Sequence, residues 1–176
     1  PADEAAFAQV NSGLTSALCG AILQEFGSGR RHVPLVLASS TQAERDNPYG
    51  RSKLAAEEAV HALAHETGNP CTIFRLPGVF GKWCRPNYNS VVATFCHNIA
   101  NDLDIQVNDP DAVIKLVYVD DVVAEFIRVV DCLPSGLSRG EVTPVYSVTL
   151  GELSAQICAF KHCRESLVSE RVGTGF

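Results

Sequence analysis

The spacing of apolar residues along the chain predicts helices alternating with strands. Apolar residues at helical spacing predict a helix over residues 3–26. An unbroken apolar run at residues 33–38 then predicts a strand buried on both faces of a parallel sheet, with Pro34 tolerated at its start. A second helix follows from about Tyr49 and ends before Gly68, with Ala56, Val60 and Leu63 on its apolar side. The apolar stripe of the first helix consists of Phe7, Val10, Leu14, Leu18, Ala21 and Ile22.

The rest of the chain continues the alternation. We expect strands at residues 71–76, 105–107, 113–119 and 143–148, and loops at 77–81 and 134–140. Helices are expected at residues 90–101, after Asp120 and Asp121, and after a capping box formed by Thr149 and Glu152. Strands separated by helices predict an α/β fold with a mostly parallel, doubly wound sheet, and 176 residues are enough for one domain.

Hydroxyl groups follow directly after the strand at residues 33–38. Ser40 and Thr41 stand at its carboxyl end, where open α/β sheets bind their ligands. Tyr49 and Lys53 are four residues apart in the first turn of the next helix, so their Cβ atoms lie on one face about 6 Å apart.

This arrangement suits the reduction of a carbonyl group. A free phenol has a pKa of about 10, and a neighbouring ammonium favours the phenolate and lowers that pKa. Tyr49 could then give a proton to a carbonyl oxygen held by a neighbouring hydroxyl, while a nicotinamide supplied the hydride. A tyrosine and a lysine at this spacing also occur by chance, so the prediction depends on the strand and the hydroxyl cluster beside them.

Composition limits the partners. The net charge is −6, which argues against a nucleic-acid partner, and no apolar run is long enough to span a membrane. Seven cysteines without a C-x-x-C motif indicate reduced, buried thiols of a cytoplasmic protein. We expect no metal site, because His61 and His65 have no third ligand beside them and Asp120 and Asp121 suit a helix N-terminus.

Several motifs together resemble the extended short-chain dehydrogenase/reductases, the family of sugar-nucleotide epimerases, dehydratases and reductases. The first motif is Ser39-Ser40-Thr41 followed by Tyr49-Gly50-x-Ser52-Lys53. The runs RLPGVFGKWCRPNYNS (75–90), IQVND (105–109) and YVDDVVAE (118–125) narrow the resemblance. They are similar to the reductases of capsular and O-antigen polysaccharide synthesis that act on UDP-linked N-acetylated 6-deoxy-4-keto sugars. The likeness covers residues 5–163.

The resemblance implies catalytic roles for five residues. Tyr49 would donate the proton, and Lys53 would tune Tyr49 and bind the nicotinamide ribose. Thr41, or failing that Ser40, would orient the carbonyl. Asn11 matches the asparagine that holds a water in the proton relay, the alternative being a solvated asparagine on a helix.

The resemblance also implies binding residues. The cofactor, NADP or NAD, would contact Ser39, Tyr49, Lys53, Leu76, Pro77, Gly78 and Val79. The sugar nucleotide would meet Arg85, Asn87 and Asn89, unless these belong to an ordinary surface loop. Lys115 could meet a substrate phosphate, although a solvated strand lysine is the alternative.

The remaining expectations depend on two parts of the family fold that this sequence does not contain. It has no G-x-x-G-x-x-G turn for a pyrophosphate and no cupin-like domain. We expect one partial dinucleotide-binding domain over residues 1–176, with substrate-binding elements from about 82 to 176. By itself it should bind NADP(H) weakly or not at all and be inactive. The strand at residues 33–38 would lose a neighbour, and its open edge predicts a homo-oligomer.

The resulting function is NAD(P)-dependent reduction of a keto group on a UDP- or dTDP-linked deoxy sugar in surface polysaccharide synthesis. An epimerase or dehydratase of the same family is the first alternative, although Gln42 and Ala43 replace the acid–base pair that dehydratases need. A non-catalytic, oligomerising remnant is the second.

Overall fold

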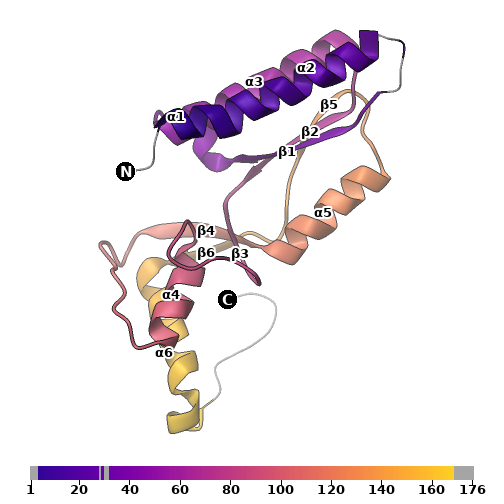
Figure 1. The fold of residues 1–176 in the computed structure, drawn as a ribbon. Helices are drawn as coiled ribbons and strands as arrows, with labels where there is room; N and C mark the ends of the chain where they lie inside the picture. The colour runs from indigo at the N-terminus through magenta and orange to yellow at the C-terminus, as the bar shows by residue number, and fades with distance from the viewer. Residues whose placement is uncertain (1–3, 28, 30–31, 169–176) are drawn as a thin grey trace. The chain divides into compact units, whose positions relative to one another are not determined.

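The computed structural model describes residues 4–27, 29 and 32–168 (Figure 1). Asp3, where the first helix was expected to begin, and Ser28 lie outside the described residues. Contacts between residues divide the chain into two compact units. The first unit comprises Pro1–Pro77 and Val123–Val142, and the second comprises Gly78–Val122 and Thr143–Phe176.

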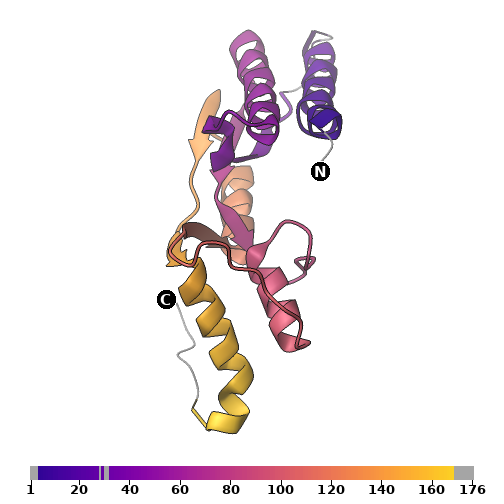
Figure 2. The same cartoon turned by 90° about the vertical axis from the view of Figure 1, so that its left-hand side faces the viewer.

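The first unit is a parallel sheet covered by helices on both faces. Its strand order is β1-β2-β5, and each neighbouring pair is parallel. The two long helices α2 and α3 cover one face side by side, and α5 covers the other (Figures 1 and 2). The elements are α1 (Glu4–Phe7), the π-helical turn η1 (Ala8–Gly13), α2 (Leu14–Gly27), β1 (Leu35–Ser40), the 3-10 turn η2 (Thr41–Glu44), α3 (Pro48–Thr67), β2 (Cys71–Leu76), α5 (Val119–Asp131, in this unit from Val123 on) and β5 (Leu137–Gly140).

Alternate residues of β2 form the two halves of this unit's core. Cys71 and Ile73 pack with α2 and α3. Phe74 points to the opposite face, where its ring lies 4.7 Å from that of Phe126 on α5. The ring also covers Gly140, where an added Cβ would lie 2.2 Å from two of its atoms. The predicted α/β fold with a parallel sheet is therefore confirmed.

The second unit is a small mixed sheet with two helices. Strand β4 pairs in parallel with β3 and antiparallel with β6. Its core joins Phe95 and Ile99 of α4 to Leu116, Val148 and Leu153. The elements are β3 (Gly78–Phe80), α4 (Val91–Ala100), β4 (Val113–Tyr118), β6 (Tyr146–Thr149) and α6 (Leu150–Ser166).

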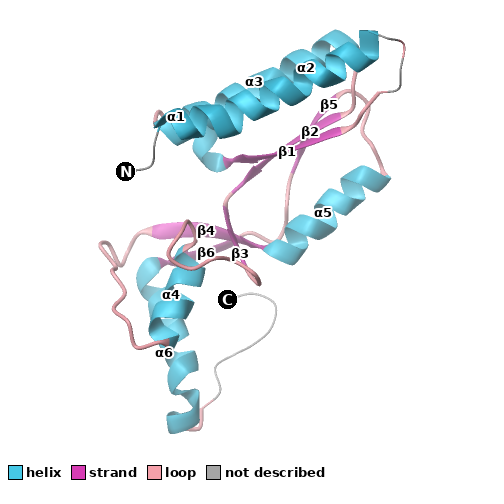
Figure 3. Ribbon diagram, in the orientation of Figure 1, coloured by secondary structure: helices cyan, strands magenta, loops and turns pink. Residues whose placement is uncertain are grey.

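Some short elements differ from the sequence predictions, as Figure 3 shows. Residues 78–80 and 137–140 were expected as loops but form β3 and β5, because each segment pairs with a longer strand. Residues 105–107 were expected as a strand but form none. The capping box at the start of α6 is confirmed: the Glu152 backbone N–H donates to Thr149 Oγ1 at 3.1 Å, and the Thr149 backbone N–H donates to Glu152 Oε2 at 3.0 Å.

The first two predicted elements are more exposed than expected. Val10, Leu14 and Leu18 have 62%, 65% and 46% of their surface exposed, so this part of the predicted apolar stripe does not face the core. Ile22, also in the stripe, is buried as predicted, and so is Cys19, which the predicted stripe did not include. Strand β1 begins at Leu35 rather than residue 33, and most of its residues are only half-buried because, in the described part of the chain, it pairs on one side alone.

The helical segment Glu4–Gly27 is long and apolar enough, by length and composition alone, to cross a membrane. The sequence prediction considered unbroken apolar runs, which Asn11 and Ser12 interrupt, and so expected no such segment. Core helices of other proteins pass the same test.

The seven cysteines are free thiols, as expected, but the prediction that they are buried is wrong for Cys96 and Cys132, which are exposed.

Candidate active site

The candidate catalytic residues of the first unit gather where β1 ends and α3 begins. Three consecutive hydroxyl residues span the end of β1 and the start of η2. Thr41 is exposed, and Ser40 is half-buried with its Oγ accepting the backbone N–H of Gln42 at 3.2 Å. Ser39 is only 5% exposed and donates its hydroxyl to Glu57 at 2.5 Å. Because this hydroxyl is occupied inside the fold, the structure does not support Ser39 as a side-chain ligand of a cofactor.

The sequence gives α3 a sharp start at the candidate site. Asn47 is the N-cap, and its Oδ1 accepts the backbone N–H of Gly50 at 2.8 Å. Pro48 occupies the first turn, where its missing N–H costs nothing. Tyr49 and Lys53 then follow one helical turn apart.

Tyr49 and Lys53 lie on the same face of α3. Lys53 Nζ is 5.8 Å from the centre of the Tyr49 ring, so the two side chains converge as the spacing predicted. The same ammonium donates a hydrogen bond to the Ala38 carbonyl of β1 at 3.2 Å. Burial lowers the pKa of Lys53.

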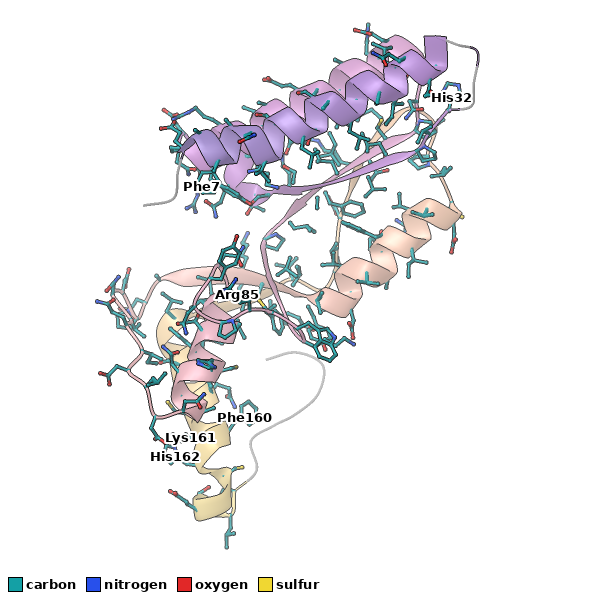
Figure 4. The ribbon with its side chains drawn as sticks, viewed as in Figure 1. Phe7, His32, Arg85, Phe160, Lys161 and His162 are labelled. Atoms are coloured by element: carbon teal, nitrogen blue, oxygen red, sulfur yellow. The ribbon has the colours of Figure 1, made fainter. Side chains whose placement is uncertain are left out.

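Phe7 packs against the ring of the candidate tyrosine. The rings of Phe7 and Tyr49 meet edge to face with their centres 5.5 Å apart, and Figure 4 labels Phe7 at the end of α1. Glu4, also on α1, pairs with Arg51 at 3.0 Å. Together these contacts attach α1 to the first turn of α3.

Gly50 brings the loop that begins with Thr41 against this same turn. A Cβ at Gly50 would lie 2.3 Å from the carbonyl oxygens of both Gln42 and Arg45. No side chain fits there, so glycine permits the close approach. From the sequence, Gly50 was recognised only as part of a motif, although a glycine in the first turn of a helix is itself a signal of close packing.

A buried ion pair supports the end of β1. The Glu57 side chain is 4% exposed and accepts hydrogen bonds from Arg75 Nη2 at 2.7 Å and from Arg75 Nε at 3.0 Å. Arg75 also pairs with Glu44 of η2 at 2.8 Å. Burial by itself raises the pKa of Glu57, but the bonds from Arg75 and Ser39 outweigh it, so the pKa lies below its ordinary value. The sequence analysis missed this pair.

Asn11 lies within the π-helical turn and reaches α3. Its Nδ2 donates to Ser52 Oγ at 3.0 Å, and Ser52 Oγ donates to the Tyr49 carbonyl at 2.8 Å. Asn11 is therefore linked to the turn that carries Tyr49, whereas the alternative interpretation made it a solvated helical asparagine. π-Helical turns occur often at functional sites.

The remaining predicted cofactor contacts run from the end of β2 into β3. Leu76 and Pro77 are half-buried and belong to the first unit. Gly78 and Val79 belong to the second unit, where they pair with Leu116 and Val117 of β4.

The predicted substrate residues all lie in the second unit. Arg85 and Asn89 are exposed, and the Arg85 guanidinium lies 5.8 Å from the centre of the Tyr88 ring (Figure 4). Asn87 has a left-handed backbone with φ of 54°, and its side-chain amide donates to Asn98 Oδ1 at 3.3 Å. Lys115 is exposed on β4, opposite Ser147 of β6.

A cavity of about 600 Å³ lies beside this loop in the second unit. None of the four predicted substrate residues lines it. Its walls include the aromatic side chains of Phe80, Trp83 and Tyr118, with Cys96 and His97 from α4. Trp83 is 96% exposed, so one aromatic face is open to solvent.

Comparison with known proteins identifies the family. A profile of the NAD dependent epimerase/dehydratase family matches residues 3–141. The chain belongs to this family. The match covers the hydroxyl residues after β1 and the Tyr49–Lys53 pair, and the resemblance drawn from the motifs is confirmed.

Two relatives resemble this epimerase/dehydratase family member over most of its length. The UDP-2-acetamido-2,6-beta-L-arabino-hexul-4-ose reductase of Pseudomonas aeruginosa strain PA103 is 52% identical over 165 residues, which are 94% of this chain and 43% of the reductase. The crystal structure of the capsular polysaccharide assembling protein CapF of Staphylococcus aureus aligns with a TM-score of 0.74 and 43% identity, over 84% of this chain and 41% of CapF. The chain thus spans less than half the length of these relatives.

A more distant solved structure shows the same fold. MoeE5 in complex with UDP-glucuronic acid and NAD aligns with a TM-score of 0.72 and 21% identity, over 85% of this chain and 54% of MoeE5. At this identity the likeness concerns the fold alone.

Proposed function

We propose that this chain is the catalytic portion of a cytoplasmic, NAD(P)-dependent reductase that acts on a keto group of a UDP-linked deoxy sugar in surface polysaccharide synthesis. A dTDP-linked sugar is the alternative substrate. The observation that carries the proposal is the convergence of Tyr49 and Lys53 on one face of α3, the helix that follows the hydroxyl residues at the end of β1. The 52% identity to a UDP-keto-hexose reductase supports the substrate class.

In this proposal the reacting carbonyl lies between the end of β1 and the first turn of α3. Thr41, or failing that Ser40, donates a hydrogen bond to its oxygen, and Tyr49 donates the proton. The positive charge of Lys53 stabilises the phenolate that remains. Asn11 holds the turn of α3 from which Tyr49 projects.

The residues present fit the nicotinamide end of a cofactor. Lys53 is half-buried and donates to a single main-chain carbonyl, so its ammonium has protons left for ribose hydroxyls. The predicted contacts in the same unit, Leu76 and Pro77, would cover the ring. When bound, the nicotinamide supplies a hydride to the carbonyl carbon. No G-x-x-G-x-x-G turn is present for the pyrophosphate, so we expect weak binding of NADP or NAD by this chain alone.

We assign the sugar nucleotide to the second unit. A pyrophosphate and a sugar need positive charges and amide groups, which come here from Arg85, Asn87, Asn89 and Lys115. Among these, Asn87 has its amide on Asn98, so its backbone and the shape of its loop contribute more than its side chain.

We expect the chain alone to be inactive because, within the described residues, one edge of β1 has no partner strand. Odd-numbered residues of β1 bond to β2, as the Leu35 N–H does to the Pro70 carbonyl, so the carbonyl of Ala38 faces the open edge. Lys53 donates to that carbonyl. A further strand at this edge would take the carbonyl and release the ammonium toward Tyr49 and the cofactor.

The same edge favours a second candidate function, a non-catalytic module that oligomerises. An unpaired strand edge is a template for another chain, and a lysine beside it limits such pairing. Sedimentation at micromolar concentration tests this: strand pairing predicts dimers or larger species, and a folded monomer contradicts it.

A chimera tests the catalytic proposal. This chain replaces the aligned 165 residues of the Pseudomonas reductase, and NADPH oxidation is followed with the UDP-linked keto sugar. We expect activity that disappears in Tyr49→Phe, with an unchanged circular dichroism spectrum, and persists in Tyr146→Phe. An active Tyr49→Phe chimera would refute the assignment, and a 4-epimer formed without net NADPH consumption would favour the epimerase alternative.

A further inference from the structure

The buried hydroxyl of Ser52 links the first helix to the turn of α3 that carries the candidate tyrosine. Ser52 is 6% exposed and uses its oxygen twice: it accepts from Asn11 Nδ2 at 3.0 Å and donates to the Tyr49 carbonyl at 2.8 Å. A helical serine that bonds to a preceding carbonyl is common. The bond from Asn11, 41 positions earlier in the chain, is what makes Ser52 different.

The π-helical turn explains how Asn11 reaches Ser52. A π turn contains one residue more than an α turn, so it changes the face that the following side chains present. Asn11 stands inside this turn, and Phe7 stands immediately before it. Phe7 contacts the Tyr49 ring edge to face, while Asn11 binds the Ser52 hydroxyl, which donates to the Tyr49 carbonyl. The ring and the backbone of Tyr49 are therefore both held by the first helix.

We infer that Ser52 is a positioning residue for Tyr49. By joining the π-helical turn to the first turn of α3, Ser52 fixes the direction in which the Tyr49 side chain leaves the helix. This inference rests on the proposed function of Tyr49 as the proton donor. Loss of the Ser52 hydroxyl would leave the Asn11 amide without its partner in a part-buried place, and the first helix would no longer hold α3 in this register.

A spectroscopic experiment on the free chain tests the inference without requiring activity. The chain is labelled with 3-fluorotyrosine, and Tyr49 is assigned in the fluorine NMR spectrum by its loss in Tyr49→Phe. In Ser52→Ala we expect the Tyr49 resonance to move or broaden. The resonances of Tyr88, Tyr118 and Tyr146, all in the second unit, should stay in place and serve as internal references.

Two further variants separate positioning from general stability. Asn11→Asp keeps the size of the side chain but removes the donor, so it should change the Tyr49 resonance as Ser52→Ala does, and it replaces that variant if Ser52→Ala does not fold. Thr67→Ala removes a similar buried hydroxyl, which donates to the Leu63 carbonyl at 2.7 Å, at the far end of α3 about 27 Å away. It should leave the Tyr49 resonance unchanged.

The inference is overturned if the Tyr49 resonance does not respond to the loss of the Asn11–Ser52 bond. It is also overturned if Thr67→Ala moves that resonance equally. Neither outcome concerns catalysis, which the Tyr49→Phe chimera tests separately, so failure of the positioning role and failure of the proposed function can be told apart.

Discussion

The buried pair of Arg75 and Glu57 makes a sharp prediction about stability. Replacing Arg75 by methionine keeps the apolar part of the side chain but leaves the Glu57 carboxylate buried without its cation. Glu57 would retain only the hydroxyl of Ser39 as a hydrogen-bond donor among the partners described above. We therefore expect Arg75→Met to destabilise the first unit strongly.

The magnitude follows from the burial of both partners. Removing one member of a buried ion pair costs about 3–5 kcal/mol. The Arg75 side chain is 22% exposed, so water weakens the pair and the lower end, about 3 kcal/mol, applies. With a urea m-value of about 1.5 kcal/mol/M, the unfolding midpoint should fall by about 2 M.

The pH dependence identifies the cause of this loss. In the wild type the pKa of Glu57 lies below its ordinary value of 4.5, so the pair stabilises the fold above about pH 4.5 and less as the pH falls through the lower, folded value. In Arg75→Met the bond from Ser39 and the charge of Arg139 still lower the pKa of Glu57, but burial, the largest influence, raises it without the bonds from Arg75 to oppose it. The variant is then penalised near pH 7 and relieved when Glu57 takes up a proton. The stability difference between the two proteins should shrink between pH 7 and pH 4.

Urea unfolding followed by far-ultraviolet circular dichroism at pH 7, 5.5 and 4 measures this difference. Arg128→Met is the matched control in the same unit, because the Arg128–Glu125 pair lies at the surface and its loss should produce no measurable shift. Glu57→Leu combined with Arg75→Met should recover most of the loss, since no unpaired charge remains. A loss in Arg75→Met that is equal at pH 7 and pH 4 would refute this reasoning.

Three further predictions concern close packing and helix capping. Gly140→Ala places a Cβ 2.2 Å from the Phe74 ring and should cost about 1–3 kcal/mol in urea unfolding, whereas an unchanged midpoint would mean that the ring can move aside. Thr149→Ala removes the N-cap of α6 and should cost about 1 kcal/mol, while Glu152→Gln keeps the capping box and should cost less, both measured by thermal melting. Gly50→Ala pushes the loop before α3 away from the helix and should lower kcat of the chimera by about 100-fold, a result contradicted by full activity.

The sequence predicted those elements whose starts, ends or shared faces are marked by neighbouring residues in the chain. Strand β2 was predicted with its observed bounds, because Cys71–Leu76 is a mostly apolar segment that begins directly after Pro70. The second long helix was placed within a residue of α3, since it ends at Gly68, which adopts the left-handed conformation with φ of 68°. The spacing of Tyr49 and Lys53 was also predictable, because one helical turn fixes which side chains share a face.

Other features depend on partners that no local pattern reveals. Strands β3 and β5 have three and four residues and exist through pairing with β4 and β2. The Glu57–Arg75 pair was not predicted because charged residues are rarely buried. The two charges neutralise each other only when α3, which carries Glu57, packs against β2, which carries Arg75. The one available signal was a charged residue inside an apolar strand.

The alternation of side chains along a strand could have predicted which of the three hydroxyl residues faces the core and which can meet a ligand. Successive side chains of a strand point to opposite faces, so Leu35, Leu37 and Ser39 share one face of β1. The two leucines pack against the core under α2 and α3. Ser39 must then point toward α3, where the structure places its hydroxyl on Glu57. Only Ser40 and Thr41 are left to meet a ligand, and both stand beyond the last buried residue of the strand.

The alternation also links the candidate site to the buried ion pair. Ser39 attaches the end of β1 to Glu57, so a loss of Arg75 that disturbs Glu57 should also displace Ser40 and Thr41.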